Sequence, residues 1–211
     1  MQKKVAELLL EIEAVFLRPN NPFTWASGIK SPIYCDNRLI FSYPDTRRII
    51  EAALAEMIII NYPDVELLAG TSTAGIGHAA LAAEILNLPM AYVRGTAKDH
   101  GRQNMIEGRV QENQKVVVVE DLISTGGSVI EVVDALREAG AQVLGIASIF
   151  SYEMTKATER LSAAEVKNVS LSGFTPLIAV ALEKGYIEEN DINKIKAFQK
   201  NPSDSSWQLI D

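Results

Sequence analysis

Apolar and polar positions along the chain repeat with two different periods, and their order predicts an α/β fold. Apolar runs short enough for buried strands lie near residues 65–69, 90–94, 115–119, 143–149 and 167–171. Apolar residues at helical spacing occupy 75–87, 128–139 and 153–164. Two more helices are expected, from Pro44 to about residue 60 and from Thr175 to Gly185, because proline favours the first turn and glycine follows the last. Strands that alternate with helices predict a parallel sheet with right-handed crossovers.

The first 41 residues follow a different pattern. Residues 3–17 predict one amphipathic helix, whose apolar side carries Val5, Leu8, Leu9, Ile12, Val15 and Phe16. Residues 22–41 are rich in proline, glycine, serine and aromatic side chains, which predicts short strands and turns. The sequence contains no internal repeat and no low-complexity linker, so we expect a single domain over residues 1–211.

The segment Val116–Ser128 carries the most informative chemistry. Its four consecutive valines favour a strand buried on both faces, because β-branched side chains are stiff and suit a pleated sheet better than a helix. Glu120 and Asp121 follow the valines, and a turn rich in glycine and hydroxyl groups then opens a predicted helix. The two carboxylates are therefore expected at the carboxyl end of a buried strand, where open α/β sheets bind their ligands.

The turn after the two acids has the composition of a phosphate-binding loop. Gly126 and Gly127 let backbone N–H groups converge on one point, and the next helix adds the positive end of its dipole. Ser124, Thr125 and Ser128 add hydroxyl donors. The carboxylates can accept hydrogen bonds from two sugar hydroxyls, directly or through hydrated Mg²⁺. The segment predicts a ribose 5-phosphate site; the alternative is an ordinary helix start beside two solvated acids.

A second turn between a predicted strand and helix, Gly70–Gly75, is also rich in glycine and hydroxyl groups. It lacks the lysine of a Walker A motif and is not a dinucleotide fingerprint. By itself this turn is only a weak indication of phosphate binding. His78 lies just beyond it, among alanine and leucine on the predicted helix, and is expected to be structural.

A long polar segment, residues 95–113, follows Arg94 and carries Lys98, His100 and Arg102. A loop of this length in a compact domain is usually a lid or a disordered stretch. A histidine flanked by glycine, cationic groups at alternate positions and the phosphate-binding turn next along the chain favour a functional loop. The alternative interpretation is a solvated, charged loop.

Composition narrows the classes of protein. The chain has 211 residues, enough for a substantial core, and a net charge of −7 that argues against a nucleic-acid-binding surface. No apolar run is long enough for a membrane span, and no secretory signal is expected. The single cysteine, Cys35, excludes an internal disulfide and is expected to be a buried small side chain. These features predict a cytoplasmic protein without nucleic-acid or membrane partners.

Three segments together resemble a known family. Val116–Ser128 resembles the ribose-phosphate signature of type I phosphoribosyltransferases. Phe23–Asp36 is similar to the base-binding segment of the orotate phosphoribosyltransferases, and Tyr92–Gly101 with Ile106–Gly108 is similar to their mobile catalytic loop. The segments occur in the family's order, and the resemblance covers nearly the whole chain. The first signature is shared by many nucleotide-salvage enzymes, whereas the other two segments are more specific to the orotate branch.

The resemblance implies a type I phosphoribosyltransferase-like parallel sheet flanked by helices, with a small N-terminal hood over about residues 1–40. It implies transfer of ribose 5-phosphate from 5-phosphoribosyl 1-diphosphate to orotate, a step of pyrimidine biosynthesis. Mg²⁺ is the implied cofactor, bound through the substrate or water rather than by direct protein ligation. A homodimer is also implied, because the family's catalytic loop reaches into the neighbouring subunit's site.

The resemblance also assigns roles to individual residues of this chain. Catalytic roles are implied for Lys98, His100 and Asp121. Contacts with the sugar diphosphate are implied for Arg94, Lys98, His100, Glu120, Asp121, Leu122, Ile123, Ser124, Thr125, Gly126, Gly127 and Ser128. Contacts with orotate are implied for Ser124, Tyr34, Cys35 and Tyr152. The turn Gly70–Gly75 is expected to face the diphosphate.

The chain departs from some family members, which carry lysine or arginine where it has Ala26, Ala74, Gly95 and Tyr152. Candidates to replace these cations are Lys30, Arg102 and Arg109. Two alternative functions stay open: a transferase for another base, such as uracil or a purine, and a non-catalytic regulator that senses the sugar diphosphate. The second needs an added DNA-binding module, typically basic, and no such segment is visible.

Overall fold

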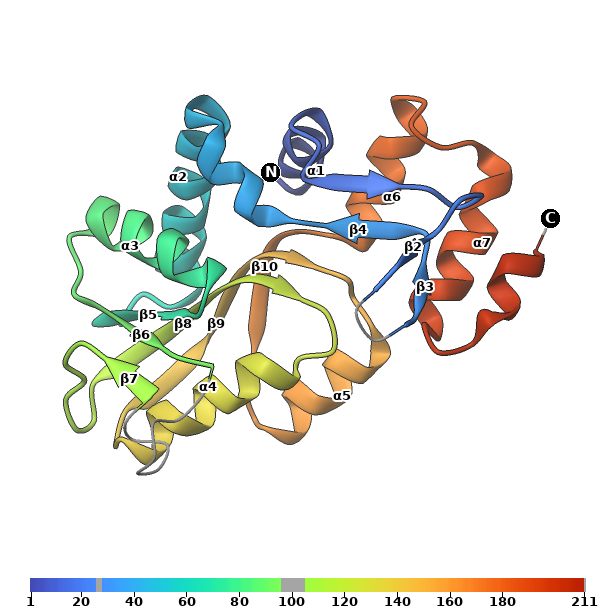
Figure 1. Cartoon of the computed structure of the whole chain (residues 1–211). Coiled ribbons are helices and arrows are strands. Elements are labelled where there is room, and N and C mark those ends of the chain that lie inside the picture. The colour runs from blue at the N-terminus through green and yellow to red at the C-terminus, as the bar shows by residue number, and fades with distance from the viewer. Residues whose placement is uncertain (26–27, 96–104, 211) are drawn as a thin grey trace.

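A six-stranded sheet forms the centre of the protein, which is described here by a computed structural model for residues 1–25, 28–95 and 105–210 (Figure 1). The strand order is β10-β9-β8-β5-β6-β7. The strands are β5 (Leu67–Thr71), β6 (Met90–Val93), β7 (Ile106–Glu107), β8 (Lys115–Ile123), β9 (Gln142–Ser151) and β10 (Asn168–Gly173). Neighbouring strands run parallel, except that β7 is antiparallel to β6. The predicted α/β fold with a mostly parallel sheet is confirmed.

Helices cover both faces of the sheet and extend beyond its β10 edge. The α-helices are α1 (Gln2–Glu11), α2 (Pro44–Asn61), α3 (Ala74–Leu86), α4 (Gly127–Glu138), α5 (Thr155–Ala163), α6 (Phe174–Glu183) and α7 (Glu189–Lys200). Two 3₁₀ helices are η1 (Asn37–Ser42) and η3 (Ser205–Leu209). Figure 1 shows α2 and α3 on one side of the sheet and α4 and α5 on the other. No helix within the described residues is both long and apolar enough to cross a membrane.

The four valines of β8 show why this strand forms the centre of the core. Val117 and Val119 pack into the apolar cluster that includes side chains of α1, α2 and α3. Val116 and Val118 pack into a second cluster with side chains of α4 and α5. All four are fully buried, so a strand with apolar residues on both faces is explained by helices on both sides.

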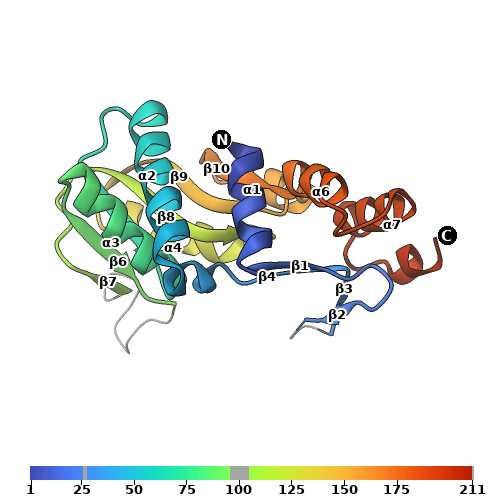
Figure 2. The same ribbon diagram turned by 90° about the horizontal axis from the view of Figure 1, so that it is seen from above.

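Two small antiparallel sheets precede η1, within the residues expected to form the hood, and the name hood is used below for these two sheets. Strand β1 (Val15–Leu17) pairs with β4 (Ile33–Cys35), and β2 (Phe23–Thr24) pairs with β3 (Lys30–Ser31). Figure 2 shows the β2–β3 hairpin projecting from the body on the side where the chain's C-terminus lies. The prediction of short strands and turns over 22–41 is confirmed as far as Cys35, whereas Asn37–Ser42 forms the 3₁₀ helix η1.

Two predicted element boundaries near the N-terminus and in β8 were wrong. The predicted helix 3–17 ends at Glu11, and the chain turns through Glu13 at a φ of 56° before β1 begins. Residues 15–17 are a strand because they pair with β4. The strand predicted to end near 119 continues to Ile123, so the two acids lie within the last part of β8 and not after it.

Two other regions carry more structure than the sequence indicated. Part of the predicted long loop is ordered as β7, which extends the sheet beyond β6. Beyond Gly185, where no element was predicted, the chain forms α7 and η3. Both elements pack through apolar side chains, Phe198 and Trp207, that are almost fully buried.

Candidate active site

A cavity of about 300 Å³ lies at the carboxyl ends of β5, β6 and β8. Its walls are formed by Thr71, Ser72, Val93, Arg94, Gly95, Met105, Glu120, Asp121, Leu122, Ser128, Glu131 and Val132. Five residues that the sequence assigned to one site are therefore brought together here: Arg94, Glu120, Asp121, Leu122 and Ser128. The end of β5 contributes Thr71 and the turn after it contributes Ser72, so the weak indication from Gly70–Gly75 coincides with the same cavity.

Glu120 and Asp121 are neighbours with different environments. Only 7% of Glu120 is exposed, and its Oε1 accepts hydrogen bonds from the Thr71 hydroxyl at 2.6 Å and from the Asp121 backbone N–H at 3.0 Å. Burial, followed by the adjacent Asp121 carboxyl, raises the pKa of Glu120 to about 8, although these hydrogen bonds act in the opposite direction. The raised pKa favours the protonated form of Glu120, and a cation bound nearby would favour its ionisation.

This raised pKa predicts an unusual dependence of stability on pH. An acid whose pKa rises on folding stabilises the protein fully below its usual value of 4.5, and this contribution is lost between there and about 8. Glu120→Gln removes the titration and keeps the shape. The variant should gain stability relative to wild type between pH 5.5 and 8.5 by a few kcal/mol at most, since each pKa unit corresponds to about 1.4 kcal/mol.

Urea unfolding of ligand-free protein at the two pH values measures this effect. Glu131→Gln is the matched control, because Glu131 also borders the cavity but is exposed. Parallel pH dependence in wild type and Glu120→Gln would contradict the assigned state of Glu120.

The turn from β8 to α4 has the backbone geometry of a phosphate-binding loop. Gly126 lies at the N-terminal cap of α4 with a φ of 77°, a backbone conformation that residues with a side chain rarely adopt. The helix begins at Gly127, so its free N–H groups point toward the loop. Arg160 of α5 donates to the Thr125 carbonyl at 3.2 Å, which fixes the loop from outside and adds a cation near it.

The side chain of Ile123 faces the core, so a contact of this residue with the sugar diphosphate would use its backbone. Only 2% of it is exposed, and its side chain packs into the cluster with α4 and α5. Its carbonyl accepts a hydrogen bond from the Tyr152 N–H at 2.9 Å. Ile123 therefore anchors the end of β8 to the end of β9, while Ser124 and Thr125 beyond it are half-buried and begin the loop.

A buried contact joins the hood to the acidic pair. Asn37, at the start of η1, is fully buried and donates from Nδ2 to the Asp121 carbonyl at 2.7 Å. The Cys35 thiol donates to Asn37 Oδ1 at 3.3 Å, so the end of β4 is held against the end of β8. Burial, with a smaller effect from the Asp121 carboxylate, raises the pKa of the Cys35 thiol, which keeps it protonated.

The residues assigned to orotate lie beside this contact but differ in exposure. Tyr34 on β4 is 38% exposed, whereas Cys35 and Tyr152 are almost fully buried. Burial raises the pKa of the Tyr152 phenol, and its ring lies 5.8 Å from that of Trp25 in the hood. Of these three residues, Tyr34 is the one that solvent reaches readily, whereas Tyr152 is buried and packs against Trp25 of the hood.

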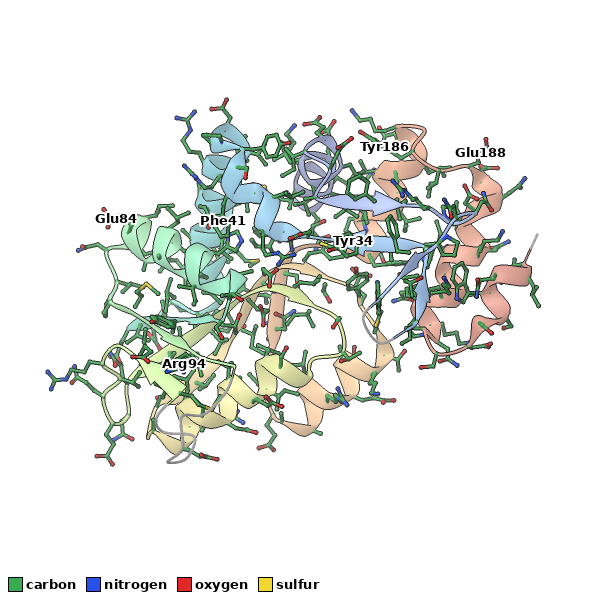
Figure 3. The ribbon with its side chains drawn as sticks, in the orientation of Figure 1. Tyr34, Phe41, Glu84, Arg94, Tyr186 and Glu188 are labelled. Atoms are coloured by element: carbon green, nitrogen blue, oxygen red, sulfur yellow. The ribbon has the colours of Figure 1, made fainter. Side chains whose placement is uncertain are left out.

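Arg94 lies directly after β6, on the cavity wall. Its guanidinium is 3.2 Å from Glu107 Oε1 of β7, and its backbone N–H bonds to the Met105 carbonyl at 2.8 Å. Figure 3 shows Arg94 well apart from Tyr34, which lies on β4. Lys98 and His100, the other predicted cations of the diphosphate end, lie outside the described residues.

The structure shows the positions at which some family members carry a lysine or arginine and this chain does not. Ala74 begins α3, and Gly95 lies exposed on the cavity wall. Of the candidate replacements, Lys30 donates to Thr24 Oγ1 at 2.7 Å within the hood hairpin, and Arg109 is exposed beyond β7. Neither belongs to the cavity wall, and Ala26 and Arg102 lie outside the described residues.

His78 has the structural environment that the sequence predicted. It is fully buried, its Nδ1 lies 2.6 Å from Glu51 Oε1 of α2, and its ring stacks on Phe41 with centroids 4.4 Å apart. These contacts tie α3 to α2 and η1.

Three site residues were missed at the level of sequence. Thr71 bonds to Glu120, Asn37 bonds to Asp121, and Arg160 bonds to the phosphate-loop turn. Thr71 belongs to the segment Gly70–Gly75, and Asn37 directly follows the segment Phe23–Asp36. Their closeness to these two motifs could therefore have identified both residues. Arg160 lies on an ordinary amphipathic helix 35 residues after Thr125, and no local pattern marks it.

Carboxylate oxygens are the donors available for a metal at this site. No group of three or more histidine, cysteine or acidic side chains within the described ranges is placed to hold a metal ion directly. Glu120 and Asp121 line the cavity together, and oxygen donors of this kind suit Mg²⁺ held partly by water and by phosphate oxygens. The residues present therefore fit a substrate-borne Mg²⁺.

Comparisons with known proteins agree with this geometry. A family described as the phosphoribosyl transferase domain matches residues 46–175, which include β5 through α5 and the whole cavity wall. These features define a phosphoribosyltransferase of type I fold. An orotate phosphoribosyltransferase of Bacillus cytotoxicus is 58% identical over 207 residues, which cover 98% of this chain and 99% of that protein.

Two solved structures show the same fold. Orotate phosphoribosyltransferase from Aeropyrum pernix is 27% identical, with a TM-score of 0.75 over 87% of this chain and 99% of that one. UMP synthase of Leishmania donovani is 26% identical, with a TM-score of 0.78; the match covers 93% of this chain and 42% of that one. The chain belongs to the phosphoribosyltransferase family and, within it, to the orotate phosphoribosyltransferases.

Proposed function

We propose that this chain, as an orotate phosphoribosyltransferase, transfers the 5-phosphoribosyl group from 5-phosphoribosyl 1-diphosphate to orotate and releases diphosphate. The observation that carries the assignment of the site is the meeting of two carboxylates, Arg94 and the start of α4 on one cavity. The carboxylates suit a sugar diol and the loop suits a phosphate monoester. Arg94 suits an anionic leaving group.

Different residues bind the 5-phosphate, the ribose and the diphosphate of the sugar substrate. The N–H groups of Gly126 and Gly127, with nearby hydroxyls, hold the 5-phosphate at the positive end of α4. Glu120 and Asp121 accept hydrogen bonds from the ribose hydroxyls. The diphosphate lies toward Arg94, Thr71 and Ser72, which belong to the wall of the same cavity. Orotate lies between Ser124 and the hood, near Tyr34.

This placement suits the bond that breaks. Cleavage of the ribose C1′–O bond leaves positive charge on the ring and negative charge on the diphosphate. The carboxylates beside the ring stabilise its positive charge. Arg94, together with Lys98 and His100 proposed from the sequence, stabilises the negative charge on the diphosphate. Mg²⁺ bound to the substrate would supply further positive charge at the diphosphate, and Glu120 and Asp121 would hold it through water.

We also propose a homodimer in which Lys98 and His100 serve the site of the neighbouring subunit. Arg94, in contrast, lies on the cavity wall of its own chain. A cytoplasmic location is proposed as well, which the free, buried thiol of Cys35 suits because reducing compartments keep cysteines unpaired.

Asp121→Asn tests the proposed role of the acidic pair. The fold should survive, because Asn37 bonds to the Asp121 backbone carbonyl and not to its side chain. The value of kcat/KM for 5-phosphoribosyl 1-diphosphate should fall about tenfold to a hundredfold, since one hydrogen bond to a charged group is worth roughly 1.5–3 kcal/mol. Steady-state kinetics at saturating orotate measure the change.

Asp134→Asn on α4 is the control, since Asp134 does not belong to the cavity wall. It should leave kcat/KM within about twofold of wild type, as ordinary surface substitutions do. If Asp121→Asn behaved like this control, Asp121 would not contact the sugar.

A further inference from the structure

The hood hairpin is too small to hold its own position. Each of its strands, β2 and β3, has two residues, and an isolated two-stranded hairpin is at best marginally stable in water. Its position is therefore set by what it packs against. Trp25, which follows β2, is half-buried and packs on the main core cluster.

A row of aromatic rings leads from the base site through Trp25 to the C-terminal segment. Trp25 meets Tyr152 at 5.8 Å and Phe198 of α7 at 5.7 Å, in both cases with the rings steeply inclined. Phe198 in turn meets Trp207 of η3 at 5.6 Å. Phe198 is fully buried and Trp207 is 2% exposed, so the row is a packed part of the core. Edge-to-face pairs of this kind are favourable beyond the area they bury.

Helix α7 also makes polar contacts, both with the segment just after β9 and with the loop between β1 and β2. Gln199 Nε2 donates to the carbonyls of Tyr152 and Glu153, at 3.3 and 2.5 Å, just after β9. On the hood side, Asn20 lies between β1 and β2; its amide donates to Asp191 at 3.2 Å and accepts from Lys194 at 3.0 Å. One helix therefore contacts both the hood and the strand end beneath it.

We propose that the C-terminal segment α7–η3 positions the hood over the orotate site, with Phe198 and Trp207 acting through Trp25 as positioning residues. This inference rests on the proposed function, because it takes the region between Ser124 and the hood, near Tyr34, as the orotate site. The phosphate loop is held from elsewhere, by Arg160 of α5. Loosening the C-terminal segment should therefore weaken the use of orotate and leave the use of the sugar diphosphate nearly unchanged.

Trp207→Ala is the test, with Leu209→Ala as the matched control on the same 3₁₀ helix, since Leu209 is 85% exposed. The KM for orotate should rise about threefold to tenfold, the scale of one lost aromatic pair. The KM for 5-phosphoribosyl 1-diphosphate and kcat should stay within about twofold, as for a neutral surface change. Trp207→Phe should restore most of the orotate KM. A lower kcat with both KM values unchanged would indicate only fewer folded molecules and would overturn the inference.

Asn20→Ala provides a second variant, at an exposed position where folding is not at risk. It should raise the KM for orotate in the same selective way, even if Trp207→Ala fails to fold. An unchanged orotate KM in Asn20→Ala would then overturn the inference.

Fluorescence separates this inference from the proposed function. The chain has two tryptophans, so Trp207→Phe leaves Trp25 as the sole reporter on the hood. Adding Asn20→Ala to that protein should shift the Trp25 emission to longer wavelength, because a loosened hood exposes the ring. This shift does not depend on turnover. A wild-type enzyme that ignored orotate would contradict the proposed function, whereas an unchanged Trp25 emission would contradict the positioning role.

Discussion

Gly126→Val should abolish tight binding of orotidine 5′-monophosphate while the protein keeps its helix content. Gly126 sits at a φ of 77°, and a β-branched residue there costs about 1–3 kcal/mol or forces the turn into another shape. A changed turn misplaces the N–H groups that face the phosphate. Losing two charged hydrogen bonds weakens binding by about a hundredfold or more, since each is worth roughly 1.5–3 kcal/mol.

Calorimetric titration with the product and circular dichroism measure the two parts of this result. Gly185→Val is the matched control, because Gly185 has a φ of 74°, open space around it and a position just after α6, away from the turn between β8 and α4. It carries similar backbone strain and should bind product normally. Tight product binding by Gly126→Val would remove the turn from the phosphate site.

Lys98→Ala should lower turnover about a hundredfold to a thousandfold, the usual scale for removing one charge-stabilising group from an active site. The expectation that the loop serves the neighbouring subunit adds a stricter test. Lys98→Ala subunits are mixed with Asp121→Asn subunits, both of low activity alone. In a heterodimer with crossed loops, one of the two sites receives an intact Lys98 and an intact Asp121, so activity should rise toward about half the wild-type value.

Independent evidence of subunit exchange, such as mass spectrometry of differently tagged chains, is the necessary control. If exchange occurs and activity stays low, each loop serves its own subunit. Arg94 would then be joined by Lys98 and His100 on one and the same chain.

The parallel core and the acidic segment could be predicted because their signals are local. Four valines with helices on either side in the sequence specify a strand buried on both faces, and Val116–Val119 are buried in this way. The turn at Gly126 carries its own signal as well, since a positive φ favours glycine.

The errors arise where distant segments decide the structure. Residues 15–17 have helical spacing of apolar side chains, yet they pair with residues 33–35 as a strand. The last residues of β8, including Glu120, are strand because they pair with β9. Neither partner can be read from the local pattern, because tertiary pairing overrides propensity.

The same reason explains the site residues that were missed. Asn37 reaches the Asp121 carbonyl across 84 positions of sequence, and Arg160 reaches Thr125 across 35. Such contacts depend on how the hood and α5 dock against the sheet. The aromatic row from Trp25 to Trp207 likewise joins the two ends of the chain.

The cavity at the end of β8 is proposed to transfer ribose 5-phosphate to orotate. The most direct measurement mixes protein, Mg²⁺ and 5-phosphoribosyl 1-diphosphate with orotate, follows the loss of orotate absorbance, and repeats the reaction with uracil. We expect orotate to be consumed only when the sugar diphosphate is present, with an equal amount of diphosphate released, and uracil not to be used. Folded protein that left orotate unchanged, or that used uracil faster, would contradict this proposal.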